Sequence, residues 1–315
     1  MDKINTYTST GSKLLFHPEF LSRAKEQGLL SPISIQIALT AMCQLSCSFC
    51  SNKNRTKTET LSYDFVINTL EKFRSCGAKT AEFTGGGDPL LHPQINEIIE
   101  HAWTIGYRIG LITNGVALER LTPDSLRKLH WIRISMNCLD YVESIDIPEM
   151  PKSVTLGFSY VISDDTDIVE SKAKLDLYSD KYMPAYIRCV QNCKNSHEDQ
   201  DRNNITFETM VSGWGSPYIY QNKSFNRPET CYWCYVKPFI FCDSYVYPCS
   251  SVVLNSDSDE KFHEKYRWKT VDELIDAYNH QPVSFNNDSC DKCVFEIQCN
   301  EVDSIMNPSN MEDFV

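Results

Sequence analysis

The chain has 315 residues and a formal net charge of −12, with 42% hydrophobic and 23% charged residues. This length and composition allow one large or two smaller globular domains with a buried core. A duplex-binding protein normally presents a basic face, so the acidic balance leads us to expect no duplex nucleic-acid partner. The basic residues Lys53, Arg55 and Lys57 are interpreted as a solvated loop.

Cysteine is unusually frequent, with 14 residues in the chain. Secreted disulfide scaffolds reach such frequencies, but they are short and begin with a signal peptide. This chain begins MDKINTYTST, without an apolar segment, and no run approaches the roughly 18 apolar residues of a membrane span. We therefore expect a cytoplasmic protein with reduced thiols and no membrane association.

The first two thirds of the chain alternate between strand and helix patterns. Residues 1–31 form a polar arm with one short helix between Phe16 and Leu30. The expected strands span 33–39, 79–84, 108–113, 131–136, 154–162 and 185–190, and the expected helices span 61–75, 93–105, 122–130 and 167–180. Six strand–helix periods are too few to close an eight-stranded barrel. We predict an α/β fold with a partial (β/α)6 barrel over 32–193 and an active site at the carboxyl ends of its strands.

The periodicity fails after Cys193. Residues 194–230 are polar and contain several Gly and Pro, which predicts a linker or a segment that covers the substrate. Residues 231–315 contain seven of the 14 cysteines and predict a small cysteine-rich α+β domain. Within it, residues 239–249 are typical of a β-hairpin.

Three cysteines follow the first strand: Cys43, Cys47 and Cys50. Three thiolates this close in sequence can face one point, but a tetrahedral metal site needs a fourth ligand. A 4Fe–4S cluster bound by these three would leave one iron open to a small chelating ligand. A structural zinc with a distant fourth ligand, or no metal at all, are the alternatives.

Four features in order resemble the radical S-adenosylmethionine (radical SAM) superfamily. The cysteine triad, with Phe49 before its third member, follows the first strand. The second strand ends in FTGGGDPLLHP (83–93), with Asp88 where the superfamily more often has Glu. The third ends in LITNG (111–115), and the fourth reads IRISMN (132–137). Each feature is weak alone, and their common placement at strand ends carries the resemblance.

The resemblance implies a set of cofactor contacts. S-adenosylmethionine would chelate the iron that the cysteine triad leaves open. It would then be reductively cleaved to a 5′-deoxyadenosyl radical, which abstracts hydrogen from an unactivated carbon. The residues implied in S-adenosylmethionine binding are Gly85, Gly86 and Gly87 through their carbonyls, Asp88 through its carboxylate, Asn114, Ser135 and Asn137 through polar groups, and Phe49 and Val161 beside the adenine.

A second cysteine region occupies the C-terminal third, with Cys231, Cys234, Cys249, Cys290, Cys293 and Cys299. It resembles the SPASM and twitch extensions of radical SAM enzymes, with Ser244 in place of a glycine and Asp303 in place of a cysteine. Two auxiliary clusters need eight ligands, so we expect one iron–sulfur cluster bound by Cys231 or Cys234 with Cys249, Cys290 and Cys293. A second cluster using Cys299 and Asp303, or a four-cysteine zinc site, are the alternatives.

The remaining candidates have simpler interpretations. Cys76, Cys138 and Cys189 are interpreted as packing residues, Cys193 as a candidate reactive thiol and Cys242 as a candidate extra metal ligand. His92 and His101 are interpreted as surface residues, and Tyr160 and Arg188 as packed or paired side chains.

The sequence leaves the substrate open. Relatives with such extensions act on peptides or on small metabolites, and a single nucleoside is not excluded. Only 32 residues precede the first strand, from which we expect no folded peptide-recognition module in this chain. The resemblance implies an electron donor such as flavodoxin or ferredoxin. The alternative function is a non-catalytic iron–sulfur or zinc sensor or scaffold.

Overall fold

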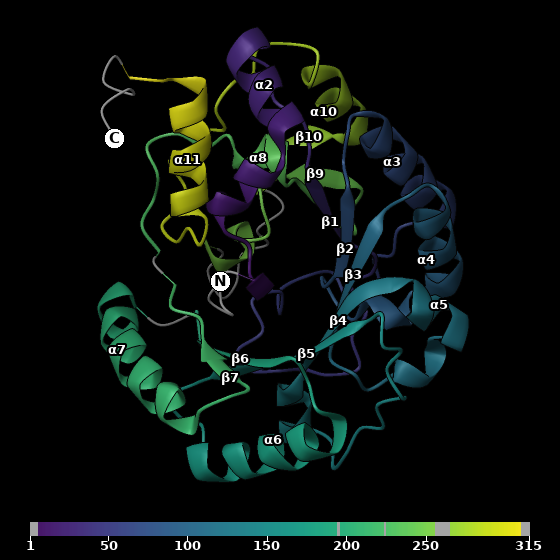
Figure 1. Ribbon diagram of the computed structural model, residues 1–315, viewed down its shortest axis with the longest axis vertical. Helices are drawn as coiled ribbons and strands as arrows, with labels where there is room; N and C mark the ends of the chain where they lie inside the picture. The colour runs from purple at the N-terminus through teal and green to yellow at the C-terminus, as the bar shows by residue number, and fades with distance from the viewer. Residues whose placement is uncertain (1–5, 194–195, 224, 256–264, 310–315) are drawn as a thin grey trace.

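The strands form one continuous curved sheet (Figure 1). The computed structural model describes residues 6–193, 196–223, 225–255 and 265–309, and the parts of the predicted arm and domains beyond these ranges are outside it. Within these ranges the sheet has ten strands in the order β10-β9-β8-β1-β2-β3-β4-β5-β6-β7. Strands β1 to β7 run parallel: Ser34–Ala38, Thr80–Thr84, Arg108–Thr113, Leu129–Ser135, Thr155–Ile162, Tyr186–Gln191 and Tyr218–Tyr220. The edges β10 and β7 do not pair, so the predicted partial barrel is confirmed.

Helices cover the convex side of this sheet. Figure 1 shows α3 (Tyr63–Ser75), α4 (Ile95–Thr104), α5 (Pro123–Lys128), α6 (Ile168–Tyr182) and α7 (His197–Trp214) outside the arc. The other helices are α2 (Pro18–Gln27), α8 (Trp233–Val236), α10 (Val271–Ala277) and α11 (Glu296–Met306), with 3-10 turns at Gly11–Phe16, Pro89–Leu91, Leu118–Arg120, Met136–Asp140 and Val252–Asn255. No helix in the described ranges is long and apolar enough to cross a membrane.

Local sequence explains where the helices begin and which side they bury. The Ser62 side chain accepts a hydrogen bond from the backbone N–H of Phe65 and caps α3. Val66, Leu70 and Phe73 then recur at helical spacing and are fully buried. This apolar stripe holds α3 against the sheet and fixes the strand order on either side of it.

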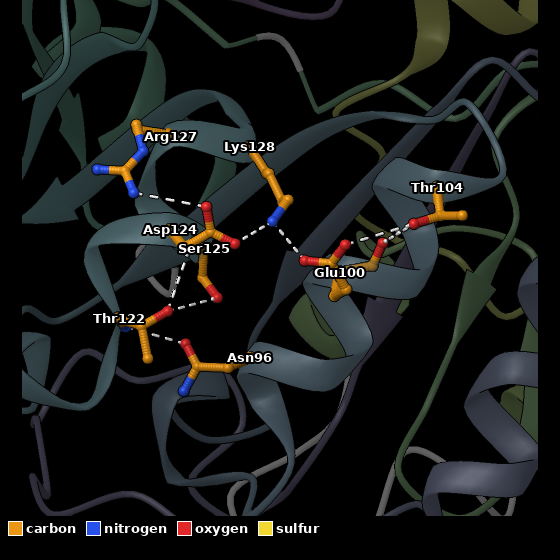
Figure 2. Close-up of polar contacts among 8 residues, drawn as sticks. All are labelled: Asn96, Glu100, Thr104, Thr122, Asp124, Ser125, Arg127 and Lys128. Atoms are coloured by element: carbon orange, nitrogen blue, oxygen red, sulfur yellow. Dashed lines mark hydrogen bonds and ion pairs between the residues drawn. The ribbon is translucent and has the colours of Figure 1, made fainter.

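Polar contacts join α4 to the start of α5 (Figure 2). The side chain of Thr122 accepts from the backbone N–H of Ser125 at 3.1 Å, and its own N–H donates to Asn96 of α4 at 3.0 Å. Lys128 forms ion pairs with both Glu100 and Asp124. Because ion pairs at the protein surface contribute little to stability, the cap is the stronger determinant of where α5 begins.

The expectation that residues 194–230 form an irregular linker is wrong for most of the described segment. Helix α7 occupies His197–Trp214, and β7 adds a seventh parallel strand beside β6. Polar residues mediate the packing: Gln191 of β6 donates to the Gln200 carbonyl at 2.9 Å and to Asn204 at 2.7 Å. The buried stripe of α7 therefore includes Gln200 and Asn204 beside Val211, which hid its helical periodicity from a hydrophobic pattern.

The cysteine-rich region is continuous with the barrel rather than a separate body. The predicted hairpin is confirmed as β8 (Phe239–Ile240) and β9 (Tyr245–Tyr247), and β10 (Lys269–Thr270) follows. Strand β8 pairs in parallel with β1, so the hairpin extends the barrel sheet at its first strand. Helix α11 packs against α2 across the open side of the arc (Figure 1). The barrel cavity is thereby walled by both ends of the chain.

Candidate active site

The cysteine triad lies on a long loop whose base is pinned to the sheet. After β1, the backbone N–H of Ala41 donates to the Glu59 carbonyl at 2.8 Å, and the hydroxyls of Thr40 and Thr60 are 2.8 Å apart. The loop between these contacts carries all three thiols at the carboxyl end of β1. All three are half-buried, and they line one cavity of about 1540 Å³ inside the barrel. The three thiols therefore line one space at this end of the barrel.

The three thiols influence one another. Burial raises the pKa of Cys43, and it raises the pKa of Cys47 to about 11, with the charges of Cys50 and Cys43 adding to the shift of Cys47. Thiolates held this close are unfavourable without a cation between them. Iron removes that cost because metal binding deprotonates the thiols and neutralises their charge.

The glycine loop after β2 is bound directly to the cysteine loop. The N–H of Gly87 donates to the Thr40 carbonyl and the N–H of Asp88 to the Met42 carbonyl, both at 2.7 Å. A Cβ at Gly87 would lie 1.8 Å from the Met42 carbonyl oxygen, so only glycine allows this approach. Gly85, Gly86 and Gly87 all line the cavity beside the thiols. The backbone of this loop is therefore available to a ligand there.

Asp88 does not face the cavity, contrary to the expectation that its carboxylate meets the ligand. It is 2% exposed and accepts hydrogen bonds from the hydroxyl of Thr113 at 2.8 Å and the backbone N–H of Asn114 at 2.7 Å. It also accepts from the backbone N–H of Leu90 at 2.9 Å. The shorter side chain of Asp turns inward to cap the next turn, so Asp88 ties the glycine loop to the end of β3.

Asn114 contacts the triad but does not line the cavity. Its side-chain amide donates to Sγ of Cys43 at 3.5 Å and to Gln44 at 3.2 Å. Such a donor stabilises a thiolate, so Asn114 acts on the cysteine loop rather than on a ligand in the cavity.

Ser135 and Asn137 do not share one face, because β4 ends at Ser135 and a 3-10 turn follows. Ser135, Phe49 and Val161 line the cavity. Asn137 is buried instead: it accepts from the backbone N–H of Val161 at 2.7 Å and donates to the Val161 carbonyl at 3.0 Å. It therefore holds the β5 wall of the cavity in place.

Arg55 and His92, which the sequence predicts at the surface, are both buried. Arg55 is buried, and it donates to the carbonyls of Ala41 and Asn52 at 2.6 Å and to Sγ of Cys50 at 3.7 Å. Lys53 and Lys57 are exposed, as a solvated loop predicts. His92, expected at the surface, is 1% exposed and bonds the Leu61 carbonyl through Nε2 at 2.8 Å. The composition of the chain does not reveal the burial of Arg55 and His92, because burial depends on packing between residues far apart in the sequence.

The six C-terminal cysteines also gather. Five of them line one small apolar cavity between Trp233 and Phe295: Cys231, Cys249, Cys290, Cys293 and Cys299. The sixth, Cys234, is fully buried and hydrogen-bonded to Cys231. Hydrogen bonds from Cys234 and Cys299 hold the pKa of Cys231 well below its usual range, while burial raises the pKa of Cys249. A buried cluster of thiols in an apolar shell is a chemically suitable iron–sulfur site.

The structure does not bring Asp303 to this cavity. Its carboxylate accepts from the side-chain amide of Asn307 at 2.9 Å on α11. Cys299, its expected partner in a second cluster, lies with Cys231 and Cys293 instead. Six cysteines then remain in this region, fewer than two four-ligand clusters require.

The other candidates have the following places. Cys138 and Cys189 are fully buried and Cys76 is half-buried, in line with packing, and Tyr160 is packed with its hydroxyl 2.8 Å from Ser171. Cys193 lines the large cavity, and Cys242 is buried with its Sγ 3.9 Å from Glu59, apart from the six gathered cysteines. His101 is half-buried beside Glu71. Within the described ranges, no three His, Cys, Asp or Glu residues are placed to share one metal ion.

Comparisons with known proteins agree with this geometry. Residues 37–143 match the family model "Radical SAM superfamily". A PqqA peptide cyclase of Xanthomonas oryzae pv. oryzae is 32% identical over 116 residues, covering 35% of this chain and 30% of that protein. A PqqA peptide cyclase of Streptomyces rochei is 30% identical over 115 residues, covering 35% and 31%. The chain thus matches about a third of the length of these curated relatives.

Solved structures share the whole architecture. Streptococcus suis SuiB bound to S-adenosylmethionine aligns with a TM-score of 0.56 and 14% identity, covering 87% of this chain and 72% of that one. SuiB bound to its precursor peptide SuiA aligns with a TM-score of 0.56 and 14% identity, covering 96% and 80%. At this identity the likeness establishes the fold.

Proposed function

We propose that this chain is a radical SAM enzyme that abstracts hydrogen from an unactivated C–H bond of its substrate, because residues 37–143 match the model of that superfamily. One observation carries the proposal: Cys43, Cys47 and Cys50 line the same cavity as the Gly85–Gly87 backbone. A non-catalytic scaffold would need only the thiols, to bind metal. The open glycine backbone beside them has a role only when a ligand binds there.

The residues present fit a 4Fe–4S cluster and S-adenosylmethionine. When bound, these cofactors supply a strongly oxidising carbon radical from a one-electron reduction. The chain's own residues would bind and orient these groups: the triad would hold the iron, and the Gly85–Gly87 carbonyls would accept hydrogen bonds from the ammonium group of the ligand. Phe49 and Val161 would flank its adenine. The surrounding barrel walls keep water away from the reacting carbon.

We propose a peptide as the substrate. The curated relatives that match at 30–32% identity are named PqqA peptide cyclases, and the cavity of about 1540 Å³ exceeds what one cofactor fills. The electron donor, flavodoxin or ferredoxin, stays a prediction.

A short peptide encoded beside the gene for this chain offers the substrate test. The peptide is synthesised with deuterated side chains and incubated anaerobically with the reconstituted protein, S-adenosylmethionine and dithionite. Deuterium in the recovered 5′-deoxyadenosine supports hydrogen abstraction from the peptide. If 5′-deoxyadenosine forms but carries no deuterium with any residue labelled, that peptide is not the substrate.

We further propose one auxiliary iron–sulfur cluster among the six C-terminal cysteines, with Cys249, Cys290 and Cys293 as ligands together with Cys231 or Cys234. The proposal predicts about eight irons and no zinc per reconstituted chain. Cys249→Ser is expected to lower the iron count toward about four, while Cys76→Ser, outside both sites, leaves it unchanged. About four irons with stoichiometric zinc in the unaltered protein contradict the auxiliary cluster.

A further inference from the structure

The cavity of the barrel is basic although the chain is acidic. Among the described residues that line it, eight are Lys or Arg and two are Glu, in a chain with 30 basic and 42 acidic residues. Most acidic residues are therefore outside this cavity. A concentration of positive charge in a concave site attracts an anionic ligand.

Arg133 and Arg188 occupy the middle of this cavity. Arg133 lies on β4 and Arg188 on β6, and both line the cavity with their strand neighbours Trp131 and Tyr186. Only β5 separates the two strands, and its register offsets Arg188 from Arg133 by two residues, so the arginine backbones lie about 12 Å apart across the sheet. The β5 partner of Arg133 is Gly157, and the ring of Tyr186 occupies the position that a side chain at Gly157 would take.

Neither arginine has a carboxylate partner among the residues that the structure describes. Nε of each is buried without a hydrogen-bond partner, and neither forms an ion pair there. Arg188 donates to the side chain of Gln221 at 3.0 Å, and the guanidinium of Arg133 lies 5.7 Å from the ring centre of Trp131. The interpretation of Arg188 as a packed or paired side chain agrees with its buried Nε and with its hydrogen bond to Gln221.

The one cavity acid near Arg133 is already neutralised. Glu82 accepts from Lys237 at 2.7 Å and from Gln36 at 2.8 Å, one bond to each carboxylate oxygen. Its burial with Lys237 makes this a closed pair. The carboxylate of Glu82 is therefore neutralised by Lys237 and does not serve as the counterion of Arg133.

The remaining cations repel one another. Burial lowers the pKa of Arg188, and the charge of Arg133 adds to the shift. Burial also lowers the pKa of Lys223, which follows β7, with Arg188 and Arg133 contributing. Buried cations without counterions cost free energy, and such arrangements persist where a ligand supplies the missing charge.

We propose that Arg133 and Arg188 bind a carboxylate of the substrate, so that the enzyme selects a peptide with an Asp or Glu residue at the position it modifies or next to it. The substrate class rests on the proposed function. Two guanidinium groups from the strands on either side of β5 can each donate to one oxygen of a carboxylate. Arg133 lies two residues before Ser135, about 7 Å deeper than the strand end where the cofactor is placed.

The test compares two short peptides, acetyl-Ala-Glu-Ala-amide and acetyl-Ala-Gln-Ala-amide, by calorimetry on the reconstituted, S-adenosylmethionine-saturated protein. We expect the Glu peptide to bind at least about tenfold more tightly, the effect of one charge-assisted bond. Arg133→Gln and Arg188→Gln should each remove this preference. Arg127→Gln, an exposed arginine on α5, is the matched control and should retain it.

Three results would overturn the proposal. The first is equal affinity of the unaltered protein for both peptides. The second is a loss of S-adenosylmethionine affinity in the arginine variants with the Glu preference intact, which assigns the arginines to the cofactor. The third is tighter binding of inorganic phosphate than of the Glu peptide.

Two further readouts on the same samples separate this proposal from other failures. Melting temperatures of the variants should not fall, because each change removes a repelling charge, so a lost preference with an unchanged melting temperature reports binding. Formation of 5′-deoxyadenosine without a Glu preference leaves the proposed function standing and rejects the carboxylate site. A Glu preference without formation of 5′-deoxyadenosine leaves the carboxylate site standing and rejects the proposed function.

Discussion

The guanidinium of Arg55 donates to Sγ of Cys50 at 3.7 Å, from a position that is 7% exposed. Its other bonds go to the carbonyls of Ala41 and Asn52, so no carboxylate neutralises it among the described residues. A buried cation on a thiolate ligand stabilises the more negative, reduced state of an iron–sulfur cluster.

Arg55→Gln should therefore lower the reduction potential of the triad cluster. Potentiometric titration followed by electron paramagnetic resonance measures this potential, and Lys53→Gln, an exposed change on the same loop, should leave it unchanged. Arg55→Lys keeps the positive charge, and its reduction potential should lie between those of Arg55→Gln and the unaltered protein. An unchanged potential in Arg55→Gln would show that Arg55 only supports the loop.

Gly87→Ala should prevent assembly of the cofactor site. The new Cβ would meet the Met42 carbonyl oxygen at 1.8 Å and push the glycine loop from the cysteine loop. We expect loss of about four irons per chain and loss of S-adenosylmethionine binding, measured by iron analysis and equilibrium dialysis. Gly213→Ala, on α7 with open space around its Cβ position, is the control and should keep both. Retention of both in Gly87→Ala would contradict the close contact between the loops.

Ser244→Gly should stabilise the hairpin between β8 and β9. Ser244 has a φ of 71°, in the left-handed region that costs a non-glycine residue about 1 kcal/mol. The SPASM resemblance places a glycine here, and the backbone conformation retains that requirement. A higher thermal midpoint than the unaltered protein is expected, whereas Ser212→Gly in α7 should lower it because glycine weakens a helix. A lower thermal midpoint in Ser244→Gly would contradict the claim that the backbone of Ser244 is strained.

His92 should make stability depend on pH. Its neutral ring donates from Nε2 to the Leu61 carbonyl and accepts at Nδ1 from the backbone N–H of Gln94, and burial lowers its pKa. The folded state therefore binds fewer protons than the unfolded state. The contribution of His92 is complete above the unfolded pKa of about 6.5 and is lost as pH falls from there to the folded value.

The measurement is the urea midpoint of the unaltered protein and of His92→Gln at pH values of about 7.5 and about 5.5, on either side of the unfolded pKa. The difference between the two proteins should shrink at the lower pH. His280→Gln, an exposed histidine, should show the same difference at both. A His92 difference that does not change with pH would mean that the ring is not held neutral.

Sequence patterns predicted the parts of this fold that repeat. Strands β1 to β6 carry buried apolar residues, and the helices α3, α4, α5 and α6 follow four of them, whereas β4 is followed only by a 3-10 turn. The motifs that resemble radical SAM proteins lie at or just after the ends of β1 to β4 in a fixed order. The patterns failed where polar side chains pack. Asn204 accepts from Gln191 of β6, and the buried side chain of Gln200 donates to the Cys193 carbonyl, so polar residues interrupt the buried stripe of α7.

The sequence predicts which residues lie near the site better than it predicts where their side chains point. Which cysteines gather follows from spacing, because short loops leave few arrangements. The direction of Asp88 and of Asn137 depends on which backbone groups need partners at the ends of neighbouring strands, and the sequence does not show this. The burial of Arg55 is likewise set by the fold of the whole loop.

The most direct test of the central claim is anaerobic reduction of the reconstituted protein in the presence of S-adenosylmethionine, with 5′-deoxyadenosine as the product measured. The protein is predicted to form 5′-deoxyadenosine, and Cys47→Ala, which removes one thiol of the triad, to form none. Cys76→Ser, outside both cysteine groups, should match the unaltered protein. Absence of 5′-deoxyadenosine from a sample with its full iron content would contradict the proposal that this cavity generates a radical.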